Sequence, residues 1–169
     1  MTTILETHLP NLLYRGKVRD TYDLGDNMLM VATDRISAFD VVLPSGIAGK
    51  GKVLAYLSAF WFEKTAHLVP NHFLAMSNDS RRLEELGVAA RLKDLDPEVA
   101  ERAMVVRKAQ RIDVECIVRG YITGSAWAEY SQAGTVGGMP MASGLEESQE
   151  FPEPLFTPTT KAPTGHDEN

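Results

Sequence analysis

One octapeptide, at residues 13–20, constrains this chain more than any other feature. It has the sequence LYRGKVRD and places Arg15, Lys17 and Arg19 at alternate positions around Gly16. On a β-strand alternate residues share a face, so the three cations would point the same way. The glycine leaves room for a close approach to the backbone. Two interpretations are equally open at this point: a cationic surface that binds a polyphosphate, or a solvated edge strand whose basic side chains block unwanted pairing.

The balance of charge restricts the partners of the chain. It has 17 Lys and Arg against 23 Asp and Glu, a net charge of -6, which argues against a general nucleic-acid-binding protein. The cations are concentrated in short segments, which favours a small anionic ligand. A content of 44% hydrophobic and 24% charged residues is typical of a soluble globular protein.

Several features predict the compartment. The single cysteine, Cys116, excludes an internal disulfide and favours a reducing compartment, and its apolar neighbours predict a buried structural thiol. The first ten residues have no basic region followed by an apolar stretch, and no apolar run is long enough to span a membrane. We therefore expect a cytoplasmic protein that binds neither nucleic acid nor membranes.

Hydrophobic spacing and turn residues predict the elements of the chain. Strands are expected at residues 18–24, 28–32, 103–108 and 114–122, the last two buried, and helices at residues 50–68, 81–86 and 125–132. In the long helix we expect Trp61 and Phe62 to belong to the core, and we expect Ser125 to cap the last helix. From residue 133 onward, closely spaced glycines and prolines predict a loop or linker.

Two further segments combine charge with turn residues. Residues 33–40, TDRISAFD, follow a predicted strand and place two carboxylates, a guanidinium and a hydroxyl in a short turn. Such turns often contain sites, although a surface ion pair in an Asx turn explains these residue types slightly better. Residues 49–52, GKGK, precede the long helix, where they would bind an anion at the helix N-terminus or form a flexible entry loop.

Glu115 and Arg119 interrupt the apolar strand predicted at residues 114–122. Charged side chains in such a strand are costly unless they are paired or bound to a ligand. Arg119 suits a bidentate contact with a phosphate or carboxylate, and Ser125 would add a hydroxyl at the start of the next helix. A ligand-binding role is favoured over an internal Glu–Arg pair, because anions bind where a strand leads into a helix.

His166, Asp167 and Glu168 lie in a segment that is rich in threonine and proline. These side-chain types suit metal coordination or the recognition of an ammonium group by carboxylates. Three adjacent residues cannot all reach one ion from a regular element, so we do not expect a complete metal site here. By itself the segment is typical of a polar loop.

Four blocks of the sequence, taken in order, resemble the SAICAR synthetase (phosphoribosylaminoimidazole-succinocarboxamide synthase) family of purine biosynthesis. The blocks are YRGKVRDTYDLG, ATDRISAFDVVLPSGIAGKGKVL, VECIVRGYITGSAW and LFTPTTKAPTGHDEN. The resemblance implies an α+β fold similar to kinase-like nucleotide folds, with a β-rich ATP-binding lobe at residues 1–110 and the start of a second α+β lobe at residues 111–169. It also implies a ligase that uses ATP and Mg²⁺ to join carboxyaminoimidazole ribonucleotide (CAIR) to L-aspartate.

The same resemblance implies roles for individual residues. Lys17 and Asp40 are implied to be catalytic, and Arg119 with Ser125 is implied to hold the CAIR phosphate. Contacts with ATP are implied for Tyr14, Gly16, Lys17, Val18, Arg19, Lys108 and Glu115. Contacts with the other substrates are implied for Asp34, Arg35, Arg119, Ser125, Lys161, His166 and Asp167.

Members of this family continue well beyond the GHDEN segment at residues 165–169. We therefore expect this chain to be the N-terminal part of the enzyme, with the carboxylates that hold Mg²⁺ in the missing C-terminal part. Two other classes stay open: a non-catalytic nucleotide-binding protein that keeps the phosphate loop and lacks the metal site, and a small-molecule kinase. Arg119 with Ser125, together with the TDRISAFD segment, favours the ligase.

Overall fold

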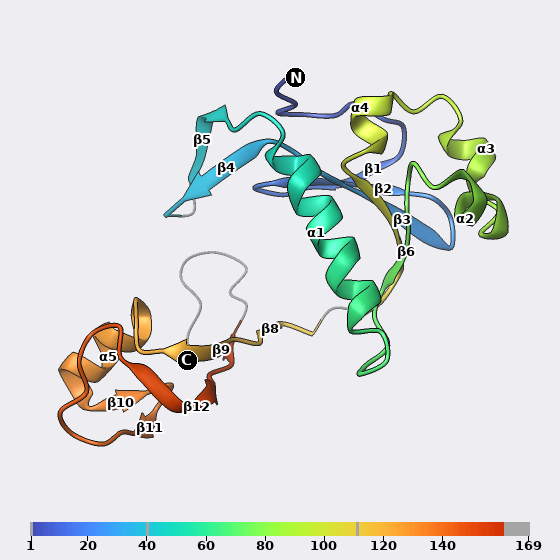
Figure 1. Cartoon of the computed structure of the whole chain (residues 1–169). Helices are drawn as coiled ribbons and strands as arrows, with labels where there is room; N and C mark the ends of the chain where they lie inside the picture. The colour runs from blue at the N-terminus through green and yellow to red at the C-terminus, as the bar shows by residue number, and fades with distance from the viewer. Residues whose placement is uncertain (1, 40, 111, 161–169) are drawn as a thin grey trace. The chain divides into compact units, whose positions relative to one another are not determined.

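The computed structural model describes residues 2–39, 41–110 and 112–160. The chain divides into two compact units, Met1–Gln110 and Arg111–Asn169, each with its own hydrophobic core (Figure 1). Both units combine helices with strands, so the predicted α+β class is confirmed.

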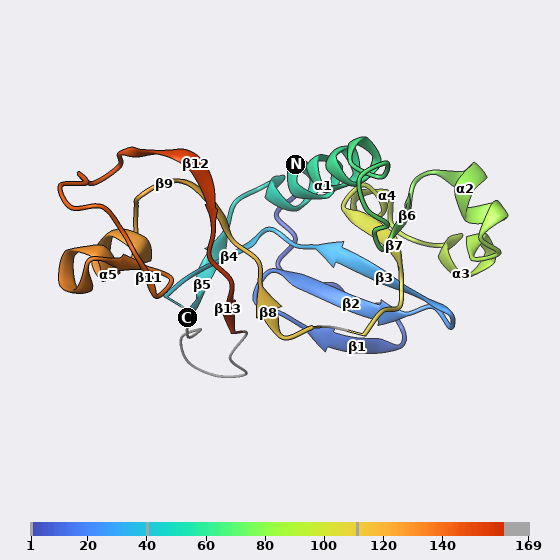
Figure 2. The ribbon, with the colours of Figure 1, turned by 90° about the horizontal axis from the view of Figure 1, so that it is seen from below.

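A five-stranded antiparallel sheet forms the centre of the first unit (Figure 2). Its strands, in spatial order, are β1 (Leu12–Arg15), β2 (Arg19–Asp23), β3 (Asn27–Ala32), β7 (Ala103–Arg107) and β6 (Phe73–Met76). The strands predicted at residues 18–24, 28–32 and 103–108 are confirmed, each to within a residue or so at its ends. The basic octapeptide lies at the connection between β1 and β2.

The central strand β3 is buried on both faces. Leu29 and Val31 belong to the core cluster that includes residues of the short helices α2 (Ser80–Glu85), α3 (Ala89–Leu92) and α4 (Pro97–Ala100). Met28, Met30 and Ala32 pack on the opposite face, which α1 (Lys50–Lys64) covers. Because successive side chains point to opposite faces, a continuous apolar run is what a strand covered on both sides requires.

Small residues make the contact between α1 and the sheet. Gly51, Ala55 and Ala59 recur every four residues along one side of the helix, and all three are buried. A Cβ atom at Gly51 would lie 2.1 Å from the carbonyl oxygen of Ala32, so only glycine allows the start of α1 to approach β3 this closely.

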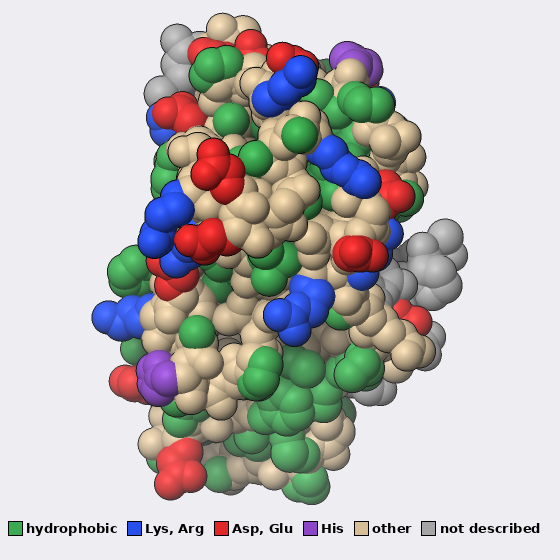
Figure 3. All heavy atoms as spheres, turned by 90° about the vertical axis from the view of Figure 1, so that its right-hand side faces the viewer, with side chains coloured by type: hydrophobic (Ala, Val, Ile, Leu, Met, Phe, Trp, Pro, Cys, Tyr) green, Lys and Arg blue, Asp and Glu red, His purple; other side chains and the backbone are tan. Residues whose placement is uncertain are grey.

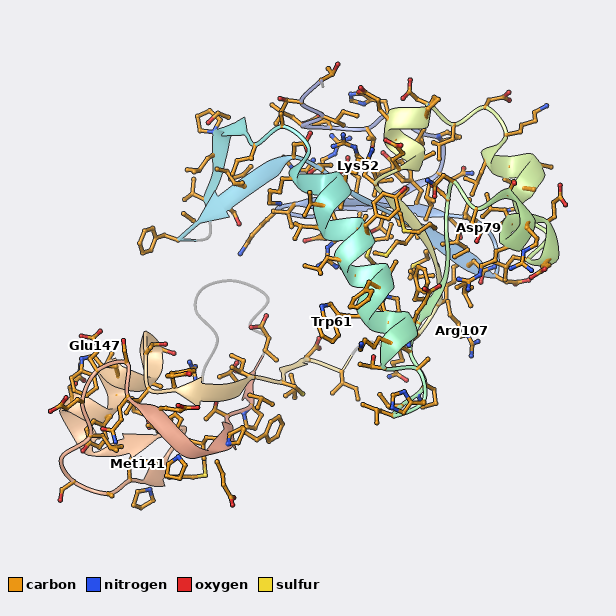
Figure 4. The ribbon with its side chains drawn as sticks, viewed as in Figure 1. Lys52, Trp61, Asp79, Arg107, Met141 and Glu147 are labelled. Carbon is orange, nitrogen blue, oxygen red and sulfur yellow. The ribbon has the colours of Figure 1, made fainter. Side chains whose placement is uncertain are left out.

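The outer side of α1 is apolar and exposed. The prediction that Trp61 belongs to the core is wrong, because this side chain is 52% exposed (Figure 4). The stripe of small residues faces the sheet, so the larger apolar side chains of the same helix are left outside. Phe62 is half-buried and stacks on Phe73, with 6.0 Å between ring centroids. The helix predicted to reach residue 68 ends at Lys64.

The second unit is built from short elements around a small core. The elements are β8 (Val114–Glu115), β9 (Val118–Tyr121), α5 (Ser125–Ala133), β10 (Thr135–Val136), β11 (Met139–Pro140), β12 (Glu150–Phe156) and β13 (Thr159–Thr160). Ile122, Ala126, Val136 and Phe151 form the buried cluster.

The single buried strand predicted at residues 114–122 is wrong. The segment forms the two short strands β8 and β9, in which Val118 is 66% exposed, and Cys116 between them is also exposed. Among the described residues, β8 pairs only with β13 and β9 only with β12. Neither strand therefore has a neighbouring strand on both edges, as a strand in the interior of a sheet would have.

The loop predicted from residue 133 is also wrong, because it contains the seven-residue strand β12. This strand pairs with β9 although it contains Pro152 and Pro154. Both prolines fall between the paired residues Glu150 and Leu155, where the register shifts. Their missing N–H groups are therefore not required by the ladder, and proline is tolerated there.

Basic and acidic side chains are interspersed over the upper part of the face shown in Figure 3, and hydrophobic side chains gather below them. This mixture gives that face no extended basic surface. Within the described ranges we find no helix with the length and hydropathy needed to cross a membrane.

We expect Gly51→Ala to destabilise the first unit by about 1–3 kcal/mol, because the new methyl group would overlap the backbone of Ala32. This is the net effect, after subtraction of the gain of up to about 1 kcal/mol in helix propensity that alanine has over glycine. The measurement is the free energy of unfolding in urea. Leu57→Ala, at a position that is 50% exposed on the same helix, is the control and should cost less. An equal loss in both variants would contradict the close approach.

Candidate functional site

The basic octapeptide forms a hairpin. β1 ends at Arg15 and β2 begins at Arg19, so Arg15, Lys17 and Arg19 do not share the face of one strand, as the strand geometry considered for them would require. Arg15 is paired in register with Asp20, and the Gly16 N–H donates to the Arg19 carbonyl oxygen at 2.8 Å. Glycine weakens a strand, which favours a reversal at this point. We refer to residues 16–19 as the glycine loop.

All four carbonyl oxygens of the glycine loop accept hydrogen bonds from within the protein. Thr33 donates to the carbonyl of Val18 through both its N–H and its hydroxyl, each at 3.0 Å. Arg35 supplies donors to the other three carbonyls: Nη2 to Gly16 at 2.7 Å, Nε to Lys17 at 3.2 Å and Nη2 to Arg19 at 3.2 Å. Two residues that follow β3 therefore fix the loop backbone.

Asp20 is fully buried and is the counter-ion of Arg35. Its Oδ1 accepts from Arg35 Nη2 at 2.7 Å, and its Oδ2 accepts from the N–H and the hydroxyl of Thr7, each at 2.9 Å. Burial alone would raise the pKa of Asp20, but the hydrogen bonds from Arg35 and Thr7 hold that pKa below its ordinary value. The sequence analysis missed Asp20 and Thr7 as site residues; a carboxylate in a predicted strand was the only signal.

Asp34 is the centre of a second buried group. Its Oδ2 accepts from the N–H of Ile4 at 2.8 Å and lies 2.8 Å from Nη1 of Arg102, and its Oδ1 accepts from the N–H of Gly51 at 2.8 Å. Burial would raise the pKa of Asp34, but these backbone N–H groups and Arg102 lower it below its ordinary value. The sequence analysis missed Arg102, which is also buried.

The turn predicted at residues 33–40 is wrong in part. Thr33 and Asp34 form the link after β3, and the chain then continues as strand β4 (Arg35–Ala38), paired with β5 (Val41–Gly46). Asp34 and Arg35 are buried with partners inside the protein, which excludes the surface ion pair that the residue types suggested. Their predicted contact with substrate stays a prediction, and their burial favours a role in holding other parts of the chain.

The residues predicted to contact ATP differ in exposure around the glycine loop. Tyr14 is 68% exposed, Lys17 and Arg19 are exposed, and Val18 is half-buried. A cavity of about 90 Å³ adjoins the loop between the sheet and α1. Its lining consists of Val18, Arg19, Met30, Ala32, Leu54, Ala55, Ser58 and Met104. The loop thus presents exposed cations beside a small, mainly apolar hollow.

Lys50 brings a further cation near the glycine loop. It is the first residue of α1, so the GKGK segment does lie at a helix N-terminus, as predicted. Burial lowers the pKa of Lys50; the Asp34 carboxylate opposes this shift, and Arg19 and Arg35 add to it. The start of α1 and the glycine loop therefore share one electrostatic environment.

Lys108 follows β7 and forms an ion pair with Asp23, with Nζ 2.7 Å from Oδ1. The hydrogen bond from Lys108, aided by the N–H of Gly25, lowers the pKa of Asp23. Glu115 lies in β8 of the second unit, paired in register with Thr159. Because Lys108 and Glu115 belong to different units, their predicted meeting at one nucleotide stays a prediction.

The structure brings Arg119 and Ser125 together in the second unit. Arg119 Nη2 donates to the Ser125 hydroxyl at 3.0 Å, and Nε donates to the hydroxyl of Thr157 at 3.0 Å. Thr157 is buried and was missed, because it lies in the stretch predicted to be a loop. The predicted cap at Ser125 is wrong: Gly124 (φ 56°) is the N-cap, and Ser125 is the first residue of α5. The Ser125 hydroxyl is therefore available to Arg119.

Four predicted site residues, Asp40, Lys161, His166 and Asp167, lie outside the described residues, as does Glu168. In the part of the chain that is described, we find no group of three or more His, Cys, Asp or Glu side chains that could hold a metal ion.

The fold and the glycine loop together define an α+β protein that presents cations at a hairpin turn of one antiparallel sheet. The family model described as SAICAR synthetase matches residues 12–169. The chain belongs to the SAICAR synthetase family, and the resemblance seen in the sequence is confirmed.

Individual relatives agree with this assignment. A phosphoribosylaminoimidazole-succinocarboxamide synthase of Elusimicrobium minutum is 53% identical over 165 residues, which cover 97% of this chain and 54% of the relative. One from Stenotrophomonas maltophilia is 48% identical over 184 residues, covering 99% of this chain and 56% of the relative. This chain thus spans about half the length of the curated relatives that it matches.

Solved structures agree as well. The SAICAR synthase of Saccharomyces cerevisiae, solved in complex with SAICAR, matches with a TM-score of 0.79 and 43% identity, over 99% of this chain and 55% of that one. A SAICAR synthetase solved with ADP matches with a TM-score of 0.66 and 22% identity, over 92% of this chain and 52% of that one. The second match shows the likeness of the fold alone.

We expect Asp34→Asn to flatten the loss of stability at acid pH. The pKa of Asp34 is lowered in the folded chain, so its contribution to stability is present above the ordinary aspartate pKa of about 4 and is lost as the pH falls through the folded value. Urea unfolding from pH 7 to pH 3 should show a variant that is less stable at pH 7 and less sensitive to acid. The control is Asp94→Asn, because the Asp94 side chain is 89% exposed. Its free energy of unfolding should depend on pH as that of the unchanged chain does. Parallel curves for Asp34→Asn and the unchanged chain would refute the assignment.

Proposed function

We propose that this chain acts as, or forms part of, an ATP-dependent ligase that condenses CAIR with L-aspartate to give SAICAR, ADP and phosphate. The observation that carries the proposal is the glycine loop, whose carbonyls are turned into the protein and whose Lys17 and Arg19 are exposed, in a chain of this family. The relative solved in complex with SAICAR, which is 43% identical, supports a ligand of this class.

The proposed reaction has two steps. A carboxylate oxygen of CAIR attacks the γ-phosphorus of ATP, so that an acyl phosphate forms and ADP leaves. The amine of aspartate then attacks the acyl carbon, an amide forms and phosphate leaves. Lys17 and Arg19 would offset the charge on the transferred phosphoryl group, which is the main catalytic requirement of such a transfer.

The remaining roles are proposed by family membership. Tyr14, Gly16 and Val18 would lie against the nucleotide, with Lys108 and Glu115 near its base and ribose. Asp40 would be catalytic on the substrate side, and Lys161, His166 and Asp167 would lie near aspartate. Mg²⁺ is proposed to accompany ATP, and no step is assigned to it. We place the enzyme in the cytoplasm, where a free cysteine stays reduced.

A second function, left open by the sequence, is nucleotide binding without catalysis. In that case the chain would be a non-catalytic nucleotide-binding protein or fragment that keeps the glycine loop.

The test is ADP release by the purified chain with ATP, Mg²⁺, CAIR and aspartate, with each substrate omitted in turn. ADP release that requires both CAIR and aspartate is the expected result for the ligase. Binding of ADP by calorimetry without any ADP release from ATP would favour the non-catalytic function. Absence of both binding and release would reject a nucleotide site in this chain.

We expect Arg119→Ala to weaken CAIR binding about tenfold or more while ATP binding changes less than about twofold. A charge-assisted hydrogen bond to a phosphate contributes about 1.5–3 kcal/mol. Arg119 is proposed to contact CAIR and not ATP. Titration calorimetry with each ligand measures both affinities. Arg81→Ala, whose side chain is 78% exposed on α2, is the control and should change neither. Equal losses for both ligands would count against the assignment.

A further inference from the structure

The four carbonyl groups of the glycine loop all point toward the protein. Each of its four carbonyl oxygens is bound on the side of Thr33 and Arg35, at 2.7–3.2 Å. A carbonyl oxygen turned toward a phosphate would repel it, since both carry negative partial charge. A loop that binds phosphates must therefore keep these oxygens away from the ligand and present N–H groups and cations instead.

Arg35 is suited to this task by the shape of its side chain. Its planar guanidinium provides five donors in a fixed arrangement. Here these donors meet three loop carbonyls, the carbonyl of Leu5 and the carboxylate of Asp20. A lysine ammonium has three donors at a single point and cannot span this set.

Arg35 is not placed to bind a ligand itself. Its side chain is 8% exposed, and its charge is balanced by Asp20, 2.7 Å away. Asp20 is in turn held by Thr7. The guanidinium is therefore committed to the protein, and any effect on a ligand must act through the loop backbone.

We propose that Arg35 is a positioning residue that turns the carbonyls of the glycine loop inward and so gives the loop its affinity for nucleotide phosphates, an inference that rests on the proposed function of the loop. Thr33 supports the same orientation at Val18. Neither residue contacts the nucleotide.

The structure offers a matched control. Arg102 is also a buried arginine, with its side chain 3% exposed, and it is paired with the buried Asp34 at 2.8 Å. Its Nε donates to the carbonyl of Glu98, and among the described residues its side chain makes no hydrogen bond or ion pair with the glycine loop. Arg35→Lys and Arg102→Lys therefore both disturb a buried ion pair, but only Arg35→Lys releases the loop carbonyls.

Two measurements on the full chain test the proposal. Amide hydrogen exchange by NMR, without ligand, follows the Gly16 N–H, which donates to Arg19 in the intact loop. Titration calorimetry follows the affinity for ADP. We expect Arg35→Lys to speed exchange at Gly16 and to weaken ADP binding, each about tenfold or more, because lysine is not a conservative replacement at a multidentate site. Arg102→Lys should lower the melting temperature while both loop measurements change less than about twofold.

Thr33→Val provides a second variant if Arg35→Lys does not fold. It removes only the hydroxyl donor to Val18, keeps the N–H donor and preserves the side-chain shape, so the chain should fold. We expect it to weaken ADP binding severalfold, a smaller effect than that of Arg35→Lys, since one neutral hydrogen bond contributes about 0.5–1.5 kcal/mol.

The outcomes separate this inference from the proposed function. Unchanged exchange at Gly16 in Arg35→Lys, or equal loss of ADP affinity in Arg35→Lys and Arg102→Lys, would overturn the positioning role. If Arg35→Lys does not fold, unchanged ADP affinity in Thr33→Val would overturn it. If the unchanged chain binds no ADP, faster exchange in Arg35→Lys alone would still show that Arg35 orders the loop, and the nucleotide function of the loop would be rejected.

Discussion

Two buried ion pairs, Arg35–Asp20 and Arg102–Asp34, determine how the first unit is assembled. A buried charge costs several kcal/mol unless it is paired and its remaining hydrogen-bonding capacity is met. Here the capacity is met largely by backbone groups from distant parts of the chain: the N-terminal residues 4–7, the glycine loop and the start of α1. The need to satisfy four buried charges therefore brings these segments together at one end of the sheet.

Packing and electrostatics depend on each other at the start of α1. The N–H of Gly51 reaches the Asp34 carboxylate only because the helix lies against the backbone of Ala32, and only glycine permits that approach. The same position brings Lys50 close enough to Arg19 and Arg35 for their positive charges to help lower the pKa of Lys50, which burial lowers most. The helix is thus both a cover for the sheet and part of the environment of the loop.

The sequence predicted elements well and contacts poorly, for a physical reason. Local patterns identified β2, β3 and β7 of the sheet, together with α1 and α5, because periodicity depends on neighbouring residues. For the cations of the octapeptide we considered the geometry of one strand, but the segment is a hairpin, because its reversal depends on hydrogen bonds from Thr33 and Arg35, farther along the chain. Asp20 and Arg102 were missed because their buried ion-pair partners, Arg35 and Asp34, lie 15 or more residues away, which no local pattern contains. The strand β12 was missed because its prolines are typical of a loop and its partner strand β9 lies about 30 residues earlier in the sequence.

The partners of an arginine distinguish the two roles that arginines have in this chain. Arg35 is bound to a carboxylate and to carbonyls, so its charge is neutralised inside the protein. In the described part of the chain Arg119 donates to two hydroxyls, which are neutral, and it stays partly exposed. Hydroxyls orient a guanidinium without cancelling its charge, so Arg119 keeps the capacity to attract a phosphate that Arg35 has lost. The family resemblance implied substrate contacts for both residues. The neutralisation of one charge and not the other is why we assign Arg35 to the loop and Arg119 to the ligand.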